Sequence, residues 1–101
     1  MTKKVRHPDY HRSWKYKTKY GITLDDYDKM LLAQQGKCAI CKTDEPGGSG
    51  ERFSVDHNHG TSEVRGLLCC NCNRGIGYLK DSPDIVAAAL LYLSTNGYYG
   101  T

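Results

Sequence analysis

Two pairs of cysteines with the same spacing are the most chemically specific feature of the sequence. Cys38 and Cys41 form one C-x-x-C pair, and Cys69 and Cys72 form the other. This spacing lets one tight turn aim two thiolates at the same ion, and two pairs complete the tetrahedron that Zn²⁺ favours. A single pair could be a redox centre. Two pairs instead predict a structural zinc site whose four thiolates leave no position open for water.

A polar segment between the two pairs indicates a second chemistry. It runs from Asp56 to His59, and Asn73 directly follows the second cysteine pair. Hydrolysis of a phosphodiester needs a divalent ion on the phosphate and a base that takes a proton from water. Asp56 is a hard oxygen ligand suited to Mg²⁺, Asn73 offers a carboxamide oxygen as a second ligand, and His57 is the natural base. Zinc would then hold the frame while the second ion serves the chemistry.

Three further residues of this region have less definite roles. His59 could bind the scissile phosphate, orient the metal ligands or cap the turn, and we expect it to act directly in the site. Asn58 suits a turn, so its role is predicted to be structural. Arg65 could contact a backbone phosphate or form a salt bridge, and the sequence alone does not separate these two roles.

A β-hairpin is predicted to position the polar segment. Residues 53–56 and 64–68 have strand character, and the turn-forming residues 58–63 join them. Adjacent residues of a strand point to opposite faces of the sheet. Asp56 and His57 can therefore converge only if the first strand ends or bends at this point.

A helix is predicted before the hairpin. Thr23 is a good N-cap with Asp26 three residues later, which approximates a capping box, and Gly36 is a natural stop. The apolar stripe of this helix is expected to be Leu24, Tyr27, Leu31 and Leu32. A weaker helical pattern covers residues 8–20, where we expect the aromatic side chains to pack on the core more than to stack on bases.

Two helices are predicted after the hairpin. The zinc site would fix Cys72 and, with it, the start of a short helix that carries Asn73. The last helix has Ser82 as its cap and Pro83 in its first position, and Gly97 ends it. Its apolar residues at helical spacing are Ile85, Ala89 and Leu93. Together with the hairpin, these elements predict a small α+β domain with flanking helices.

Positive charge is concentrated at the start of the chain. Residues 1–22 contain seven Lys and Arg residues against Asp9 alone, while the chain as a whole has a net charge of +3. Such an arm favours a polyanionic partner, nucleic acid first, although a solvated helix face is the alternative. Lys15, Lys17 and Lys19 are the predicted DNA contacts of the arm.

Length and composition limit the class of protein. The chain has 101 residues, 39% of them hydrophobic, which suits one domain with a thin core that a structural metal would help to hold. The longest apolar run, 85–93, is too short for a membrane span. Five cysteines without a signal peptide favour a soluble, cytoplasmic protein with reduced thiols. The fifth, Cys70, falls outside the two pairs and is interpreted as a small buried hydrophobic residue.

Taken together, these motifs resemble the recombination endonuclease VII family of phage HNH nucleases. The resemblance runs from about Tyr20 to Leu93 and includes four motifs around the predicted sites, which are Cys38-Ala-Ile-Cys41, Val55-Asp56-His57-Asn58-His59, Val64-Arg65-Gly66-Leu67-Leu68-Cys69 and Cys72-Asn73. It also includes Lys19-Tyr20-Gly21-Ile22-Thr23 and Asp81-Ser82-Pro83.

The resemblance implies a ββα-metal core with zinc at the four cysteines. It also implies Mg²⁺ or Mn²⁺ at Asp56 and Asn73, His57 as general base, and a phage or prophage protein that acts in the host cell. The junction resolvase of the family has a long helical extension that builds an intertwined dimer, whereas this sequence ends at Thr101. We therefore expect nicking or general DNA cleavage by a monomer or weak homodimer.

The resulting expectation is a metal-dependent DNA endonuclease in three parts. Residues 1–19 form a basic arm, residues 20–97 the HNH domain, and residues 98–101 a tail. A zinc-dependent DNA-binding module without catalysis is the main alternative, and a zinc-stabilised protein-interaction domain is a third. Neither alternative explains why Asp56, His57 and Asn73 occur together.

Overall fold

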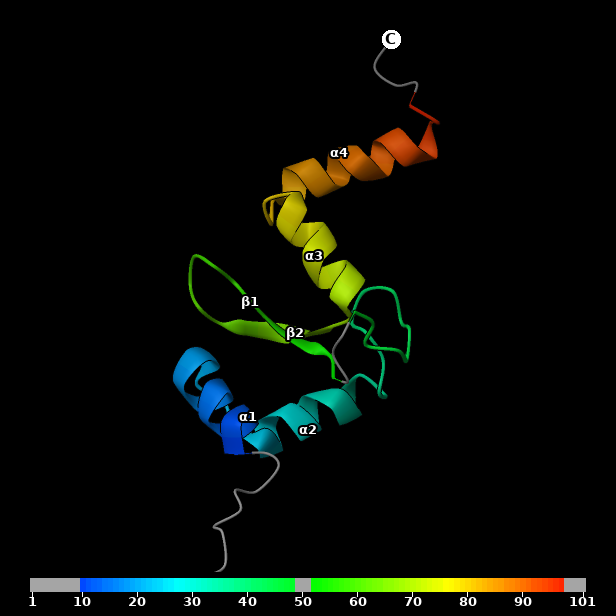
Figure 1. Ribbon diagram of the computed structural model, residues 1–101. Helices are drawn as coiled ribbons and strands as arrows, with labels where there is room; N and C mark the ends of the chain where they lie inside the picture. The colour runs from blue at the N-terminus through cyan, green and yellow to red at the C-terminus, as the bar shows by residue number, and fades with distance from the viewer. Residues whose placement is uncertain (1–9, 49–51, 98–101) are drawn as a thin grey trace, which may run out of the picture.

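The computed structural model describes residues 10–48 and 52–97, so residues 1–9 of the predicted basic arm and the whole predicted tail lie outside the described residues (Figure 1). The elements in chain order are α1 (Tyr10–Lys15), the π-helical segment η1 (Tyr16–Tyr20), α2 (Leu24–Ala33), β1 (Ser54–His57), β2 (Val64–Leu68), α3 (Cys70–Tyr78) and α4 (Pro83–Ser94). This composition confirms the predicted α+β class. None of the helices within the described residues is long and apolar enough to cross a bilayer.

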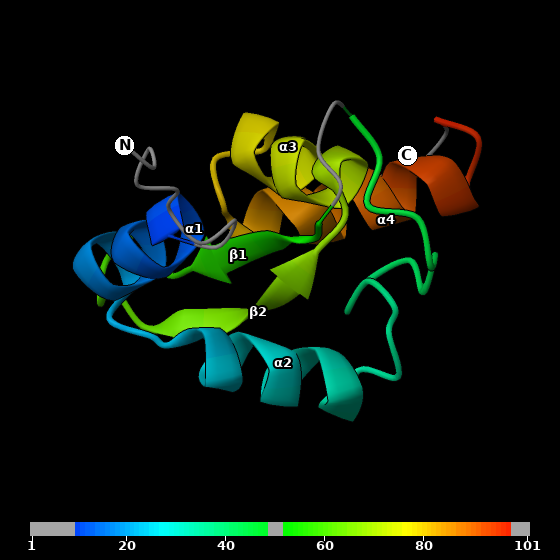
Figure 2. The same ribbon diagram turned by 60° about the horizontal axis from the view of Figure 1, so that its bottom comes forward.

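The antiparallel hairpin of β1 and β2 is the centre of the fold. Helix α2 lies along one side of it and α3 along the other (Figure 2). The loop between the strands is closed by Asn58, whose Oδ1 accepts hydrogen bonds from the backbone N–H groups of Gly60 (2.8 Å) and Thr61 (3.1 Å). The structural role predicted for Asn58 is therefore confirmed.

The hairpin contains a β-bulge opposite the point where the first strand was expected to end or bend. Asp56 pairs with Gly66 and His57 pairs with Val64, so the register shifts between the two pairs. Arg65 is thus the extra residue on β2. A bulge increases the local twist and bends the strand that carries the extra residue, so the irregularity lies on β2, directly opposite Asp56 and His57.

The capping box and the length of α2 follow from its terminal residues. Thr23 Oγ1 accepts from the N–H of Asp26, and Asp26 Oδ2 accepts from the N–H of Thr23, both at 3.0 Å. The helix ends at Ala33, and Gly36 adopts a left-handed φ of 72° after it. Tyr27 is buried, but Leu32 is 79% exposed. The predicted stripe was wrong at Leu32 because adjacent positions on a helix cannot both face one narrow hairpin.

The side chain of Gln34, just after α2, joins this helix to the open edge of β2. Its Nε2 donates to the carbonyl groups of Leu67 (2.9 Å) and Lys37 (2.8 Å), and its Oε1 accepts from the N–H of Leu67 (2.9 Å). The amide thus pairs with the strand much as another strand would. This contact also holds the segment that leads into the first cysteine pair.

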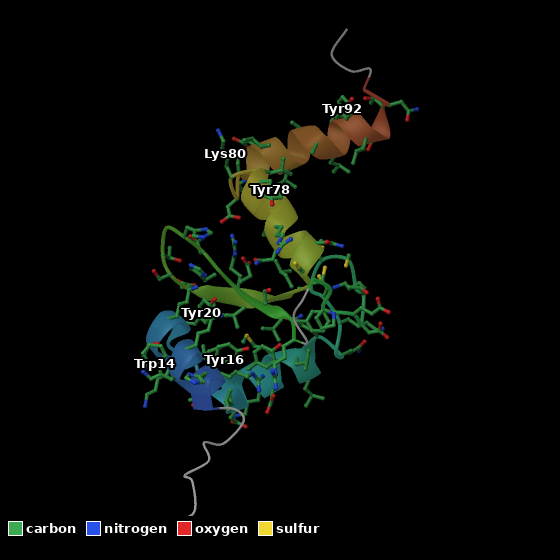
Figure 3. All side chains as sticks on the ribbon, in the orientation of Figure 1. Trp14, Tyr16, Tyr20, Tyr78, Lys80 and Tyr92 are labelled. Carbon is green, nitrogen blue, oxygen red and sulfur yellow. The ribbon has the colours of Figure 1, made fainter. Side chains whose placement is uncertain are left out.

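Aromatic side chains attach α1 and η1 to the rest of the molecule. The rings of Tyr16 and Tyr27 stack with centroids 5.3 Å apart, and Tyr20 lies 6.1 Å from Tyr16. Trp14, in contrast, is 63% exposed and lies on the outer side of α1 (Figure 3). The buried core consists of Tyr16, Tyr27, Cys38, Phe53, Val55, Leu67, Leu68 and Cys69.

Helix α4 has the predicted cap, but it buries none of its residues. Ser82 Oγ accepts from the N–H of Ile85 at 3.1 Å, and Pro83 takes the first position. The helix extends away from the hairpin (Figure 1), and none of its residues is buried; Leu93 is 73% exposed. Its apolar residues surround the helix instead of forming one stripe, so no single face directs it onto the core.

Candidate functional site

The four paired cysteines come together at the start of α3, where Figure 3 shows a group of sulfur atoms. All four Sγ atoms lie within 4.8 Å of one another, and Cys41 Sγ is 3.7 Å from Cys69 Sγ. Four sulfurs bound to one zinc at about 2.3 Å would lie about 3.8 Å apart. The cysteines are free thiols, and they are positioned to bind a metal such as zinc.

Backbone N–H groups point at these sulfurs and set their electrostatics. Cys38 Sγ accepts from the N–H of Ile40, and Cys69 Sγ accepts from the N–H of Cys72, each at 3.4 Å. Burial opposes ionisation of Cys38, but backbone hydrogen bonds, including the one from Ile40, outweigh it and lower its pKa to about 6.

Cys72 behaves in the opposite way from Cys38. Burial raises the pKa of Cys72 to about 12, and hydrogen bonds with the Cys69 and Cys41 thiols act in the same direction. The cluster therefore ionises readily at one thiol and resists ionisation at another. A divalent cation would supply the charge that four thiolates in so small a space require.

Cys70 stays outside the thiol cluster. It is only partly buried, so the expectation of a buried hydrophobic residue was too strong. Its Sγ lies so close to Gly48 that a Cβ at that position would come within 2.8 Å of the sulfur. The residue therefore packs against the loop that follows the first cysteine pair.

Asp56 is buried and is paired with Arg65, the extra residue of the bulge. Arg65 Nε donates to Asp56 Oδ2 at 2.7 Å, and Arg65 Nη2 donates to Asp56 Oδ1 at 3.0 Å. This two-point contact is the stronger form of Arg–carboxylate pairing, and it raises the pKa of Arg65 above its ordinary value. Of the two roles left open for Arg65, the salt bridge is the one present.

His57 lies among aromatic rings beside the bulge. Its ring centroid is 4.7 Å from that of His59 and 5.6 Å from that of Tyr20. Tyr20 therefore links η1 to the hairpin. The two histidines of the predicted site are neighbours in space, although one is at the end of β1 and the other is in the loop.

Asp81, in the turn between α3 and α4, belongs to the same cluster. Its Oδ2 pairs with His59 Nδ1 and also lies 3.6 Å from Arg65 Nη2. Asp81 was not predicted as part of the site, because Asp81-Ser82-Pro83 indicates the start of a helix. The signal available in the sequence was an acidic residue, Asp81, directly before Ser82, which can cap the helix without it.

Asn73 lines a groove beside β1. The groove has a volume of about 520 Å³, and besides Asn73 it is lined by His11, Arg12, Lys15, Tyr16, Tyr20, Arg52, Phe53, Ser54 and Val55. Among the described residues, no hydrogen bond joins the side chain of Asn73 to Asp56 or His57. Tyr20 connects the two regions, because its ring is in the groove wall and contacts His57.

The three predicted DNA-contacting lysines occupy different positions. Lys15 lines the groove. Lys17 and Lys19 are exposed on η1, and the ammonium of Lys19 lies 5.5 Å from the ring centroid of Tyr20. The groove also contains two cations that were not predicted as DNA contacts, Arg12 and Arg52. They are 40 residues apart in sequence and meet only in the folded chain.

Comparison with known proteins supplies the family. The sequence profile described as recombination endonuclease VII matches residues 13–95. Two relatives are the Gene 59 proteins of Mycobacterium phage L5 and Mycobacterium phage D29, each 43% identical over 75 residues, or 73% of this chain and 44% of the relative. The chain thus spans less than half the length of these curated relatives. No solved structure matches it significantly. Because the profile covers most of the sequence, the chain belongs to the recombination endonuclease VII family.

Proposed function

We propose that the protein is a metal-dependent DNA endonuclease of the ββα-metal, or HNH, type. His57 is the general base, and Asp56 and Asn73 hold a Mg²⁺ or Mn²⁺ ion. The family supports a nuclease that acts on DNA, and the hairpin followed by α3 gives the β-β-α order that this type of site requires. The catalytic roles are assigned from the chemistry of the side chains.

The observation that carries the proposal is the convergence of side chains at the bulge. Asp56 contacts Arg65, His57 contacts His59, and both contact partners meet at one oxygen of Asp81. In a regular strand, Asp56 and His57 would diverge to opposite faces. Here contacts through Arg65, Asp81 and His59 link the carboxylate of Asp56 to the imidazole of His57, which supports a shared chemical task.

The donor set fits a hard divalent ion. Asp56 and Asn73 both offer oxygen, and two protein ligands leave room for water and phosphate, as Mg²⁺ prefers. When bound, such an ion stabilises the charge that develops on the phosphate. His57 takes the proton from the attacking water. Among the described residues, Arg65 uses only Nε and Nη2 on Asp56, so Nη1 remains as a donor for a phosphate oxygen.

The groove beside Asn73 is the proposed path for a DNA strand. Arg12, Lys15 and Arg52 give its walls positive charge, and Tyr20 extends the wall to the ring of His57. Phosphate contacts of this kind position a strand without reading its sequence. The exposed Lys17 and Lys19 would extend the same positive surface along η1.

The zinc cluster has a structural role in this proposal. Cys72 precedes Asn73, and both lie in the first turn of α3. Cys69 caps the helix through its own sulfur. Zinc at the four thiolates would therefore fix the beginning of α3 and hence the position of Asn73 relative to β1, without taking part in hydrolysis.

Plasmid nicking in the presence of Mg²⁺ or Mn²⁺ tests the function. We expect wild-type protein to convert supercoiled to open-circular DNA and His57→Ala to lose about 100-fold or more of that rate, the usual contribution of a general base. Zinc content and circular dichroism must match between the two proteins. Wild-type protein that binds DNA but cuts none with any divalent ion would instead establish the non-catalytic DNA-binding module.

A further inference from the structure

We propose that Asp81 is a positioning residue that fixes the ring of His59 and the guanidinium of Arg65 at the nuclease site. The catalytic part of this inference rests on the proposed function. The geometric part does not, since it concerns which nitrogen of His59 carries a proton. Asp81 is neither a predicted metal ligand nor a predicted base, and it lies outside the hairpin.

The contacts of Asp81 are directed at the hairpin. Its Oδ2 accepts from Nδ1 of His59, and the same oxygen faces Nη2 of Arg65 at 3.6 Å. The Asp81 side chain is 18% exposed, whereas that of His59 is 69% exposed. An exposed imidazole is thus paired with a largely buried carboxylate.

The backbone of the turn explains how Asp81 reaches this position. Lys80 and Asp81 both have left-handed φ angles, of 62° and 52°. The N–H of Asp81 donates to the carbonyl of Ile76 at 2.8 Å. Two consecutive non-glycine residues in this region are uncommon and costly. In Figure 3 the turn that Lys80 marks lies on the same side of the molecule as the hairpin loop.

Capping of α4 does not account for this carboxylate. Ser82 is the N-cap, and its Oγ already accepts from the N–H of Ile85. Asp84 supplies the acidic residue of the first turn. Asp81 makes its side-chain contacts with His59 and Arg65 instead, so its position serves the hairpin and not the helix that follows it.

The chemical consequence is a defined tautomer of His59. A carboxylate only accepts hydrogen bonds, so the neutral imidazole must carry its proton on Nδ1. Nε2 is then the unprotonated ring atom and the one that can meet a substrate or an ion. Carboxylate partners orient and fix the tautomer of histidines in this way, and removing such a partner commonly costs about 10- to 100-fold in activity or metal affinity.

The test is long-range ¹H–¹⁵N NMR of the zinc-loaded full chain labelled at histidine, recorded at mildly alkaline pH. We expect His59 of the wild type to carry its proton on Nδ1. In Asp81→Ala and the isosteric Asp81→Asn, we expect the Nε2–H form to become populated, because the carboxylate that excludes it is gone. Asp84→Ala, which removes an acidic residue of the first turn of α4, should leave His59 unchanged.

The kinetics of plasmid nicking then distinguish a positioning role of Asp81 from a role in folding. We expect Asp81→Asn to lower kcat about tenfold or more with little change in KM, and Asp81→Glu to restore part of it. The inference is overturned if wild-type His59 carries its proton on Nε2, if its tautomer is the same in both variants, or if the tautomer changes while kcat does not. If the wild type has no nuclease activity, the proposed function fails, and the NMR result still decides the geometric part.

Discussion

Replacing Gln34 by alanine tests the contact that joins α2 to the sheet. The side chain makes three hydrogen bonds, with the N–H of Leu67, the carbonyl of Leu67 and the carbonyl of Lys37. The variant removes all three without changing any residue of the hairpin or the cysteine cluster. Because Leu67 is fully buried, water cannot replace the lost acceptor at its N–H.

The expected loss of stability follows from these three bonds. A typical intramolecular hydrogen bond contributes about 1 kcal/mol, and a buried N–H left without a partner costs about 1–3 kcal/mol. The carbonyl of Leu67 keeps a second donor, the N–H of Ala39 at 3.1 Å. We therefore expect Gln34→Ala to lower the free energy of unfolding by about 2–4 kcal/mol, a large part of the roughly 5–15 kcal/mol typical of a domain.

Urea unfolding followed by circular dichroism at fixed free zinc measures this loss. Gln35→Ala is the matched control, because Gln35 is exposed and its substitution leaves the three hydrogen bonds of Gln34 intact. Gln34→Glu should be at least as damaging as Gln34→Ala, since it keeps an acceptor for Leu67 but places a negative charge against two carbonyl groups. If Gln34→Ala is as stable as Gln35→Ala, the hydrogen bonds of Gln34 do not stabilise the fold and the prediction is wrong.

Three further predictions concern the site, the zinc cluster and pH. Asn73→Ala should lower the cleavage rate about 100-fold or more, because a ligand of the charge-stabilising ion is lost. Asn71 is exposed on the same helix, and Asn71→Ala should cut normally. Equal rates for the two variants would remove Asn73 from the proposed site. A strong zinc chelator should abolish the helical signal reversibly, and Cys69→Ser should bind less than one equivalent of zinc, since binding and folding are coupled; a chelated chain that keeps its fold would contradict this. Burial raises the pKa of Tyr27 to about 12, so its neutral form is favoured in the folded state; stability should be unaffected by this group below about pH 10 and should fall by about 2–3 kcal/mol between pH 10 and 12. Tyr27→Phe should lack that component in alkaline urea titrations, at a cost of about 1 kcal/mol for its hydrogen bond to the Phe53 carbonyl, and an alkaline slope equal to that of the wild type would refute the assignment.

Local signals in the sequence were sufficient to predict most elements. The capping box at Thr23, the Ser82-Pro83 start of α4 and the turn at Asn58 all formed as expected. The strand predicted for 64–68 matches β2, and the other begins one residue later than predicted. These features depend on contacts within a few residues, and therefore on the residue types and their spacing alone.

The four-cysteine cluster was also predictable, although its two pairs are distant in sequence. Each C-x-x-C pair forms its own turn, and only one coordination geometry unites two such turns around one ion. The sequence therefore identified the four cysteines that the fold brings together as a possible metal site. The structure added the backbone hydrogen bonds that lower the pKa of Cys38 and the burial that raises the pKa of Cys72.

Only the tertiary structure decided the partners of the catalytic candidates. The pairing of Asp56 with Arg65 depends on the register shift, and the position of Asp81 depends on two left-handed residues between helices. The groove joins Arg12 and Arg52 across 40 residues of sequence. Each of these contacts results from how separate elements pack, whereas spacing along the chain reports only what one turn, one strand or one metal ion can bring together.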